Sequence, residues 1–437
     1  SHSADRCTIC YVQAVLLFLS CYDLPTMTDQ PAAKTPLLAL PGLKAVLAAR
    51  TLSAFSSQVQ AVAVGWQIYA LTHSAAALGF VGLAQFLPMV AFIFPAGHAA
   101  DQHNRQRIVV TCQTIEALAA AFMAVASFTH HLAPFMIYGL VALFGVCRAF
   151  EMPAQQTFLP SMVSAADFPR AAALSSSLFQ VASIAGPSLG GLLYGLGADV
   201  CYALCAIGFT IAAFSTASMR LRFPARAKQP ATLAAVFGGI AFLKSRPTML
   251  GALSLDLFAV LLGGATAMLP LYATDILHAG PWGLGLLRAA PAIGALLVAM
   301  VLARYPMGRH SGFWMFVSVA IFGVATILFG VSTSIPLSVL ALAVLGGADV
   351  ISVMVRSSLV QLGTPDDMRG RVSAVNMLFI GSSNQLGEFE SGMLASAIGA
   401  VPAVVLGGIG TLVITGVWMA LFPGLRKLDR LEDITPD

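Results

Sequence analysis

Four charged side chains lie inside long apolar stretches of this sequence, where they could bind or steer protons. Arg148 and Glu151 share one stretch, Asp256 lies in a second, and Glu388 lies in a third. A charge inside a lipid-spanning segment is costly, and such a residue usually has a function. A carboxylate in a dry site can take up and release a proton, so we predict three carriers, in this order: Asp256, Glu388 and Glu151. The alternative for each carboxylate is an ion pair that only fixes helix packing.

Arg148 precedes Glu151 by three residues, which places both side chains on the same face of a helix. An arginine stays charged and cannot carry a proton itself, but it can change the proton affinity of a neighbouring carboxylate as a substrate arrives. The pair is therefore predicted to take part in proton coupling, unless it is a structural ion pair.

Further charges within apolar stretches are candidates for lining a central cavity. Glu388 and Glu390 are two residues apart and point in different directions, so at most one of them is expected to share a cavity with Arg288. Arg50 and Glu116 both fall near the inner third of their segments, the first and the third, and are expected to pair with each other. The cavity candidates are Arg288, Asp349 and Arg356.

The composition excludes most classes of protein. The chain has 437 residues, of which 58% are hydrophobic and only 10% charged, whereas a typical soluble domain carries about 25% charged residues. A soluble enzyme, a disordered protein and a nucleic-acid binder are excluded, and a polytopic membrane protein remains. The cysteines show no disulfide spacing, and those inside apolar stretches are interpreted as small apolar fillers: Cys112, Cys147, Cys201 and Cys205.

Twelve apolar segments are long enough to cross a bilayer, which takes about 20 residues per helix. All are expected to be helices, because lipid cannot satisfy an open backbone and the runs lack the alternation of a β-barrel strand. Lys and Arg lie in the connections on one side only, which predicts that both termini face the cytoplasm. The segments are 42–71, 75–100, 106–129, 133–155, 168–195, 199–219, 249–276, 282–303, 312–331, 335–358, 371–395 and 399–422.

The two halves of the chain resemble each other weakly. Residues 69–88 (YALTHSAAALGFVGLAQFLP) compare with residues 272–291 (YATDILHAGPWGLGLLRAAP). Many secondary transporters are built from repeats around a site that opens to each side in turn. The sequence thus predicts an all-α membrane protein with two pseudo-symmetric six-helix bundles. The expected parts are a tail at 1–36, disordered or not native before Met27, a bundle at 37–220, a cytoplasmic linker at 221–248, a bundle at 249–422 and a cytoplasmic tail at 423–437.

The connection after the second segment reads GHAADQHNRQR and carries Gly97, Asp101, Arg105 and Arg107. A glycine permits close helix approach, and a carboxylate here can sit at the N-terminus of another helix or meet an arginine. Such contacts hold one conformational state and must break in the other, so we predict a conformational gate. The alternative is an ordinary basic turn.

The fifth segment contains a run of small residues with a proline. Gly186, Gly190 and Gly191 allow close packing on neighbouring helices, and Pro187 removes one helix hydrogen bond and permits a bend. By its residue types alone, this run predicts a small-residue interface between closely packed helices.

These motifs resemble those of the major facilitator superfamily. The loop is similar to G-x-L-x-D-R-x-G-R-R/K, with Ala99, Gln102 and Asn104 as departures. The fourth segment, LFGVCRAFEMPA, resembles a motif in which Arg is followed by a polar residue and then Gly, here replaced by Met152. The fifth resembles G-x-x-x-G-P-x-x-G-G of proton-antiport exporters, with Ala182 for the first Gly.

The resemblance covers about 37–422 and is nearest to the enterobactin-exporter-like branch, through GHAADQHNRQRIVV, the stretch leading into the seventh segment, and QLGTPDDMRGRVSAVNMLFIGSSNQLGE. It implies the major facilitator fold, a role of the fourth-segment Arg in proton movement, and a fifth-segment antiporter motif that favours export. It leaves the substrate open, because that branch contains both siderophore and drug exporters.

The function favoured by the sequence is a secondary active exporter of a small amphipathic molecule, siderophore or drug-like, in exchange for protons. The chain has no G-x-x-x-x-G-K-S/T loop for ATP, and a proton gains about 2.3 kcal/mol per 100 mV on crossing the membrane. The alternative is a lysophospholipid-type translocator of the same superfamily. A non-transporting sensor and a membrane enzyme are less favoured, because no signalling domain, metal-ligand cluster or nucleophile motif is found in the sequence.

No cofactor and no metal ion are expected. The expected partners are the substrate, protons and the lipid bilayer, without nucleic acid. We expect a multi-pass monomer in the cytoplasmic membrane.

Overall fold

The computed structural model describes residues 37, 40, 42–164, 167–219, 233–305, 309–365 and 368–429. By its internal contacts the chain divides into two units, Ser1–Leu40 and Pro41–Asp437. In the first unit, the backbone N–H of Leu40 donates to the carbonyl of Leu37 at 3.1 Å. The helices belong to the second unit.

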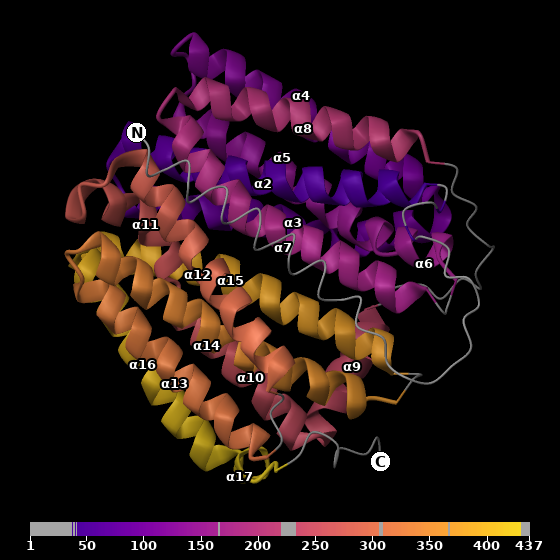
Figure 1. The fold of residues 1–437 in the computed structure, drawn as a ribbon, viewed down its shortest axis with the longest axis vertical. Helices are drawn as coiled ribbons and strands as arrows, with labels where there is room; N and C mark the ends of the chain where they lie inside the picture. The colour runs from indigo at the N-terminus through magenta and orange to yellow at the C-terminus, as the bar shows by residue number, and fades with distance from the viewer. Residues whose placement is uncertain are drawn as a thin grey trace. The chain divides into compact units, whose positions relative to one another are not determined.

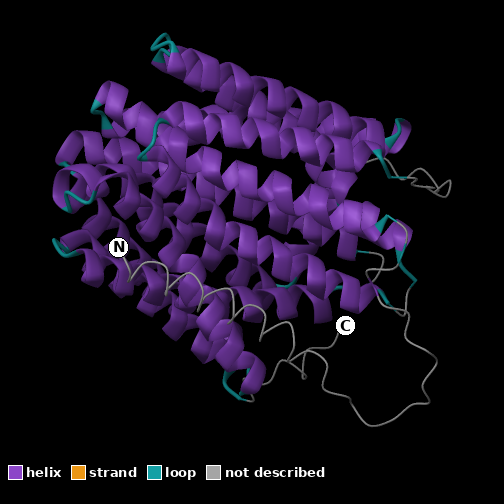
Figure 2. Ribbon diagram, turned by 45° about the horizontal axis from the view of Figure 1, so that its top comes forward, coloured by secondary structure: helices purple, strands orange, loops and turns teal. Residues whose placement is uncertain are grey.

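Every regular element in the described ranges is a helix, and no strand is found there (Figure 1; Figure 2). Helices lie at each of the apolar segments predicted from the sequence. The long ones are α2 (Leu43–Thr72), α3 (Ala75–Gln102), α4 (Arg105–Phe128), α5 (Pro134–Gln155), α7 (Phe168–Tyr194), α8 (Ala198–Ala217), α10 (Pro247–Leu262), α12 (Gly280–Arg304), α13 (Ser311–Val331), α14 (Ile335–Leu362), α15 (Arg369–Ile398) and α16 (Ala400–Leu421). The short ones are α6 (Phe158–Met162), α9 (Leu233–Ser245), α11 (Leu269–Leu271) and α17 (Pro423–Arg426).

Local side chains explain where several helices begin. Ser74 is the N-cap of α3 and accepts a hydrogen bond from the backbone N–H of Ala77. Asn104 caps α4 by accepting from the backbone N–H groups of Gln106 and Arg107. These caps satisfy backbone donors that have no partner within the helix, so each short turn can reverse the chain without leaving donors exposed to lipid.

The segment predicted as one helix over 249–276 is interrupted. The helix α10 ends at Leu262, and Gly263 and Gly264 lead into a 3₁₀ turn (η2, Ala265–Met268), α11 and a π-helical turn (η3, Tyr272–Ile276). A Cβ on Gly264 would lie 2.4 Å from the carbonyl oxygen of Gly387 in α15. The break therefore lies where α15 approaches too closely for a side chain.

The helices pack in two groups. In the first helix group (α2–α8), α2 packs on α7 and α8, α3 on α5, and α4 on α5 and α8. In the second helix group (α10–α17), α12 packs on α14, α13 on α14 and α16, and α10 on α15 and α16. Two helix pairs carry most of the contact between the groups, α3 with α15 and α7 with α12. That the groups are separate domains joined by a linker stays a prediction.

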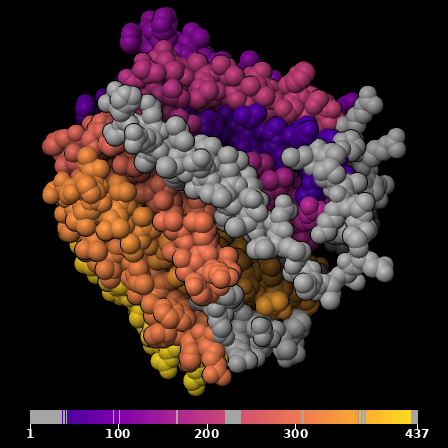
Figure 3. Space-filling model, viewed as in Figure 1, coloured from indigo at the N-terminus to yellow at the C-terminus, as the bar shows by residue number. Residues whose placement is uncertain are grey.

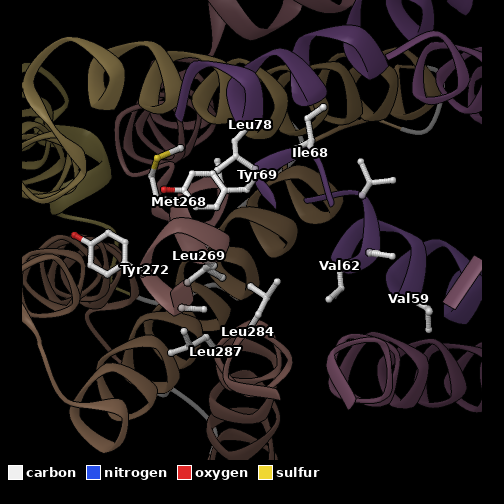
Figure 4. Packing of buried hydrophobic residues seen from close by; sticks show 14 of the residues in the cluster. Val59, Val62, Ile68, Tyr69, Leu78, Met268, Leu269, Tyr272, Leu284 and Leu287 are labelled. Atoms are coloured by element: carbon white, nitrogen blue, oxygen red, sulfur yellow. The ribbon is translucent and has the colours of Figure 1, made fainter. Parts of the chain in front are cut away.

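The largest buried apolar cluster extends across this junction (Figure 4). It joins Ile68 and Tyr69 of α2 and Leu78 of α3 to Leu269 of α11 and Leu284 of α12. These residues lie near the turns at 73–74 and 277–279, at the end of the molecule called here the predicted outer end. The two groups thus share one apolar core at that end.

Nine helical segments in the described ranges are long and apolar enough to cross a membrane. The helices α2, α7 and α15 are 30, 27 and 30 residues long but more polar, and they carry contacts between the groups. Twelve as the number of spans, and the cytoplasmic position of both ends, stay predictions.

Large apolar side chains are exposed along the peripheral helices, as expected for contact with lipid tails. In the space-filling view α4 and α8 form the purple and magenta top, and α16 lies at the yellow lower left edge (Figure 3). The exposed side chains include Leu118, Phe122, Val125, Ile207, Ile211, Phe214, Ile321, Val324, Leu328, Ile409, Val413 and Val417.

Candidate functional site

Glu151 lies in a buried polar network that ties four helices of the first group together. Its Oε1 accepts hydrogen bonds from Gln113 Nε2 of α4 at 2.8 Å, Gln155 Nε2 of its own helix at 2.6 Å, and Ser53 Oγ of α2 at 3.4 Å. Gln113 Oε1 in turn accepts from Thr216 Oγ1 of α8 at 2.9 Å. One carboxylate oxygen therefore accepts three hydrogen bonds, and these fix the position of the Glu151 side chain.

Arg148 does not pair with Glu151. Its side chain is exposed, whereas Glu151 is buried, and within the described residues no hydrogen bond or ion pair joins Arg148 to another group. The alternative of a structural ion pair between them is therefore not realised. Arg148 instead presents its charge on an open face of α5.

The predicted pairing of Arg50 with Glu116 is wrong. Glu116 is 4% exposed, its Oε2 lies buried without a hydrogen-bond partner among the described residues, and its electrostatic neighbours there are Glu151, Cys147 and Arg148. The reason is packing, because α8 lies against both α2 and α4 and these two helices make no extended contact in the part of the chain described. Depth along a span therefore did not indicate proximity.

Asp256 of α10 and Arg356 of α14 form a buried ion pair. The exposed fraction is 6% for Asp256 and 5% for Arg356. Asp256 was predicted first among the proton carriers, and its negative charge is neutralised by Arg356, which was predicted to line a cavity. The third cavity candidate, Asp349, lies on α14 beside them and lines a small cavity together with Asp256. No hydrogen bond or ion pair joins Asp349 to any other described residue.

Arg288 and Glu388 lie at the junction of the two helix groups, and each fills a space left by a glycine of the first group. A Cβ on Gly65 of α2 would lie 3.1 Å from Nη2 of Arg288. A Cβ on Gly82 of α3 would lie 2.8 Å from Oε2 of Glu388. We call these two spaces the glycine notches. The Nε of Arg288 is buried without a hydrogen-bond partner, and the two charges interact electrostatically.

Glu390, the neighbour of Glu388 on α15, has a different environment. It accepts a hydrogen bond from Ser391 Oγ at 3.5 Å, and Arg288 is not among its electrostatic neighbours. Of the two glutamates, Glu388 is therefore the one that faces Arg288.

The small residues of α7 pack on two helices at once. A Cβ on Gly186 would lie 2.7 Å from Gln58 Cβ of α2, and one on Gly190 would lie 3.2 Å from Val59 Cα of the same helix. Gly191 instead faces the other group, where a Cβ would lie 2.6 Å from Gly285 Cα of α12. This run therefore forms both the α2–α7 interface and part of the junction.

Pro187 contributes to the same junction, because its carbonyl oxygen would lie 3.0 Å from a Cβ on Gly285. The pair α3 and α15 makes a similar contact, with a Cβ on Gly79 only 3.1 Å from Gly392 Cα. Both close contacts lie toward the predicted outer end, so neither helix pair can approach further there.

A hydrogen bond between the groups lies at the same end. The hydroxyl of Tyr69 in α2 donates to the carboxylate of Asp275 in the π-helical turn η3. This contact was not predicted from the sequence, although Tyr69 and Tyr272 open the two repeat stretches. Tyr272 stays within its own group and donates to the carbonyl of Gly330 at 2.8 Å. The repeat was the sequence signal that singled out these two tyrosines. Of the two, Tyr69 bonds to the opposite helix group and Tyr272 does not.

The connection at 97–107 has a structural role at the opposite end. Arg105 Nε donates to the carbonyl of Ala100 at 3.0 Å, and Gln106 Nε2 donates to the carbonyls of Thr216 and Met219 at the end of α8. Arg107 is exposed, Gly97 lies within α3, and the side chain of Asp101 lies outside the described residues. The predicted gate at Asp101 stays a prediction.

The sequence profile of the transmembrane secretion effector family matches residues 35–436. The chain belongs to this family. Among similar members of the major facilitator superfamily, enterobactin exporter EntS of Citrobacter koseri is 26% identical over 400 residues, which cover 91% of this chain and 95% of that protein. Multidrug efflux pump Tap of Mycolicibacterium fortuitum is 27% identical over 383 residues, which cover 84% and 92%.

Solved transporter structures share the fold of this family member. A bacterial homologue of the human lysosomal transporter Spinster aligns with a TM-score of 0.67 at 15% identity, covering 88% of this chain and 95% of that one. The POT family transporter PepTSo aligns with a TM-score of 0.68 at 14% identity, covering 88% and 98%. The protein is a multi-pass transporter of the cytoplasmic membrane, as the sequence predicted.

Proposed function

We propose that this transporter exports a small amphipathic molecule, siderophore or drug-like, in exchange for protons that enter the cell, by alternating access. Its membership of the transmembrane secretion effector family supports transport. Two similar proteins, which align over most of their own lengths, are named as an enterobactin exporter and a multidrug efflux pump. These names support outward transport of such cargo.

The observation that carries proton coupling is the seating of Arg288 and Glu388 in the glycine notches of the other helix group. When the groups part at the outer end, α2 leaves α12 and α3 leaves α15. The notches then lose their charged occupants, and Glu388 reaches water on that side. When the groups close again, the carboxylate returns to a site where water is scarce.

A carboxylate that alternates between water and a dry site can take up a proton on one side and release it on the other. We therefore assign proton carriage across the junction to Glu388. Arg288 competes with the proton for the carboxylate charge, so its electrostatic pull favours release once the outer end has closed. One proton driven by 100 mV supplies about 2.3 kcal/mol toward this cycle.

The first helix group supplies the remaining parts. Arg148 presents on α5 a charge that has no ion-pair partner among the described residues, within the electrostatic reach of Glu116 and Glu151. We assign to Arg148 the link between cargo and proton, and to Glu151 the positioning of α5. Neither α5 nor α14 makes an extended contact with the opposite group in the part of the chain described. We place the cargo between these two helices, in a monomer with both termini in the cytoplasm.

The glycine contacts of α7 and α12 close the outer end in this scheme, and the connection holding Gly97, Asp101, Arg105 and Arg107 gates the opposite end. Gly186 and Gly190 fix α7 against α2, while Gly191 meets α12. The antiporter motif thus has a mechanical role in the proposal.

The test is proton flux in proteoliposomes that hold the purified protein and a pH-sensitive dye. A catecholate siderophore, a lipophilic cation and a lysophospholipid are added in separate runs. We expect flux with the siderophore or the cation, loss of that flux in Glu388→Gln, and retention in Glu390→Gln. Glu390 is the matched control because it lies two residues away on the same helix and does not face Arg288.

Equal flux in the two glutamine variants would contradict the assignment to Glu388. Transport of the lysophospholipid alone, without proton movement, would overturn the antiport proposal in favour of a lipid translocator.

A further inference from the structure

A small cavity lies inside the second helix group, away from the junction that holds Arg288 and Glu388. Its volume of about 10 Å³ for the centre of a water molecule leaves room for a single water. Helices α10, α13 and α14 form its walls, which are apolar except at four side chains: Asp256, Ser318, Asp349 and Ser352.

The two serines of the cavity have hydrogen-bonding capacity that the described residues do not use. Ser318 Oγ donates to the carbonyl of Met315 at 2.8 Å, which leaves only its lone pairs for the cavity. Ser352 is 2% exposed, and its Oγ has no hydrogen-bond partner. A buried hydroxyl without a hydrogen-bond partner destabilises the folded state. Ser352 therefore points to a hydrogen-bonding occupant of the cavity, and a water fits the space.

Asp349 differs from Glu151, the buried carboxylate of the first helix group, in its hydrogen-bond partners. Glu151 lies on α5, the fourth predicted span, and has three hydrogen-bond donors. Asp349 lies on α14, the tenth predicted span, and has no donor among the described residues. Where the first group fills the space beside its carboxylate with amide side chains, the second group leaves a cavity.

Two carboxylates, Asp256 and Asp349, line this cavity, and one positive charge, that of Arg356, is paired with the first of them. Arg356 neutralises Asp256 through their ion pair, so Asp349 is left alone. Of the helices that pack on α14, α13 has no ionisable side chain. The described ionisable side chains of α12 and α15 are Arg288 and Glu388, which interact with each other at the junction, and Arg304, Arg371 and Glu390.

We propose that this cavity is a second proton site, in which Asp349 takes up a proton through one water molecule held by Ser352. The proton binds to a carboxylate oxygen of Asp349, and the water keeps its hydrogen bonds to Ser352 and to the lone pairs of Ser318. This proposal rests on the proposed proton antiport. It adds a titrating site that is not at the junction, so that each transport cycle moves one proton more than Glu388 alone would carry.

The first test reads protonation directly and does not need transport. Infrared difference spectra of the purified protein are recorded between high and low pH, and the C=O stretch of protonated carboxyl groups is followed. We expect one component of this band to be lost in Asp349→Asn and kept in Glu390→Gln. In Ser352→Ala the component should stay but move in frequency, because its hydrogen-bonding partner has changed.

A band unchanged in Asp349→Asn would overturn the proposal. If sodium chloride at fixed pH removed the component, the cavity would bind sodium ions in place of a proton, which would also overturn it. Folding of each variant is checked by its elution from a sizing column and its thermal unfolding midpoint. If Asp349→Asn does not fold, the frequency shift in Ser352→Ala tests the proposal, and an unshifted band in that variant would overturn it.

The second test measures how many protons exchange for each cargo molecule, from the pH gradient that just balances a known cargo gradient. The ratio should fall by one in Asp349→Asn. Loss of coupling in Glu388→Gln together with an unchanged ratio in Asp349→Asn would overturn the cavity site alone. Absence of coupling in the wild-type protein would overturn the antiport function, whereas the infrared result would still decide whether Asp349 binds a proton.

Discussion

Adding one methyl group to Gly191 should shift the protein away from the state closed at the outer end. In the closed state a Cβ at this position would lie 2.6 Å from both Gly285 Cα and the carbonyl oxygen of Pro281. Carbon atoms in ordinary contact lie about 3.5–4.0 Å apart, so α7 and α12 must separate by about 1 Å. All the close atoms belong to the backbone of α12, so no change of rotamer relieves the contact.

Overpacking of this kind costs about 1–3 kcal/mol. The strain exists only while α7 and α12 are together, so it acts almost wholly on the closed state. The ratio of closed to open molecules should therefore fall by about 5-fold to 150-fold in Gly191→Ala, since every 1.4 kcal/mol is a factor of ten.

Double electron–electron resonance measures this ratio directly. Spin labels at His131 and Thr333 lie on exposed turns of the predicted outer end, one in each helix group. Gly191→Ala should add a longer-distance population to the distribution in a background without native cysteines. Gly139→Ala and Gly416→Ala are matched controls, because a Cβ at either position meets nothing within 4 Å.

A distance distribution in Gly191→Ala that equals that of the wild type would refute the strain at the α7–α12 contact. An equally large shift in the two control variants would refute it too, because the effect would then not come from this contact.

Other changes test individual contacts. Arg356→Met should lower the thermal unfolding midpoint, at a cost of about 3–5 kcal/mol, by leaving Asp256 charged and buried without its partner; adding Asp256→Leu should recover most of the loss, and an additive loss would contradict the pairing. Tyr69→Phe removes a hydrogen bond to the carboxylate of Asp275, a type of bond that contributes about 1.5–3 kcal/mol, so the open population at the outer end should rise about 10-fold or more in the same resonance assay. An unchanged population would show that this bond does not hold the end closed. Arg148→Ala should abolish coupled transport in proteoliposomes while elution and thermal unfolding stay as in the wild type, and wild-type transport would exclude Arg148 from coupling.

The positions of the long helices could be predicted because each is an unbroken apolar run between turn residues. The break after Leu262 could not. Gly263 and Gly264 lie in a run that remains apolar throughout, and the reason for the break is the backbone of Gly387, which is remote in the sequence. A contact that acts across more than a hundred residues leaves no local pattern to read.

The charges of the candidate site could be found from sequence, but their partners could not. Asp256 was expected to carry a proton, and the structure places Arg356 against it, since α10 and α14 bring the two residues together. Arg50 and Glu116 were matched by depth, and α8 separates their helices. Burial within an apolar run predicts that a charge needs compensation, whereas the identity of the compensating group depends on helix packing.

Gly82 and Gly285 occupy the same place in the two repeat stretches, GLAQFLP and GLLRAAP, yet they meet different partners. Gly285 lies against Gly191, so the α7–α12 contact is backbone on backbone. Gly82 lies against the side chain of Glu388, so the α3–α15 contact encloses a charge. Opening the first contact separates backbone from backbone, whereas opening the second also removes a carboxylate from its buried place. In the proposed cycle, the α7–α12 contact therefore sets how tightly the outer end closes, and the α3–α15 contact makes that closure depend on whether Glu388 carries a proton.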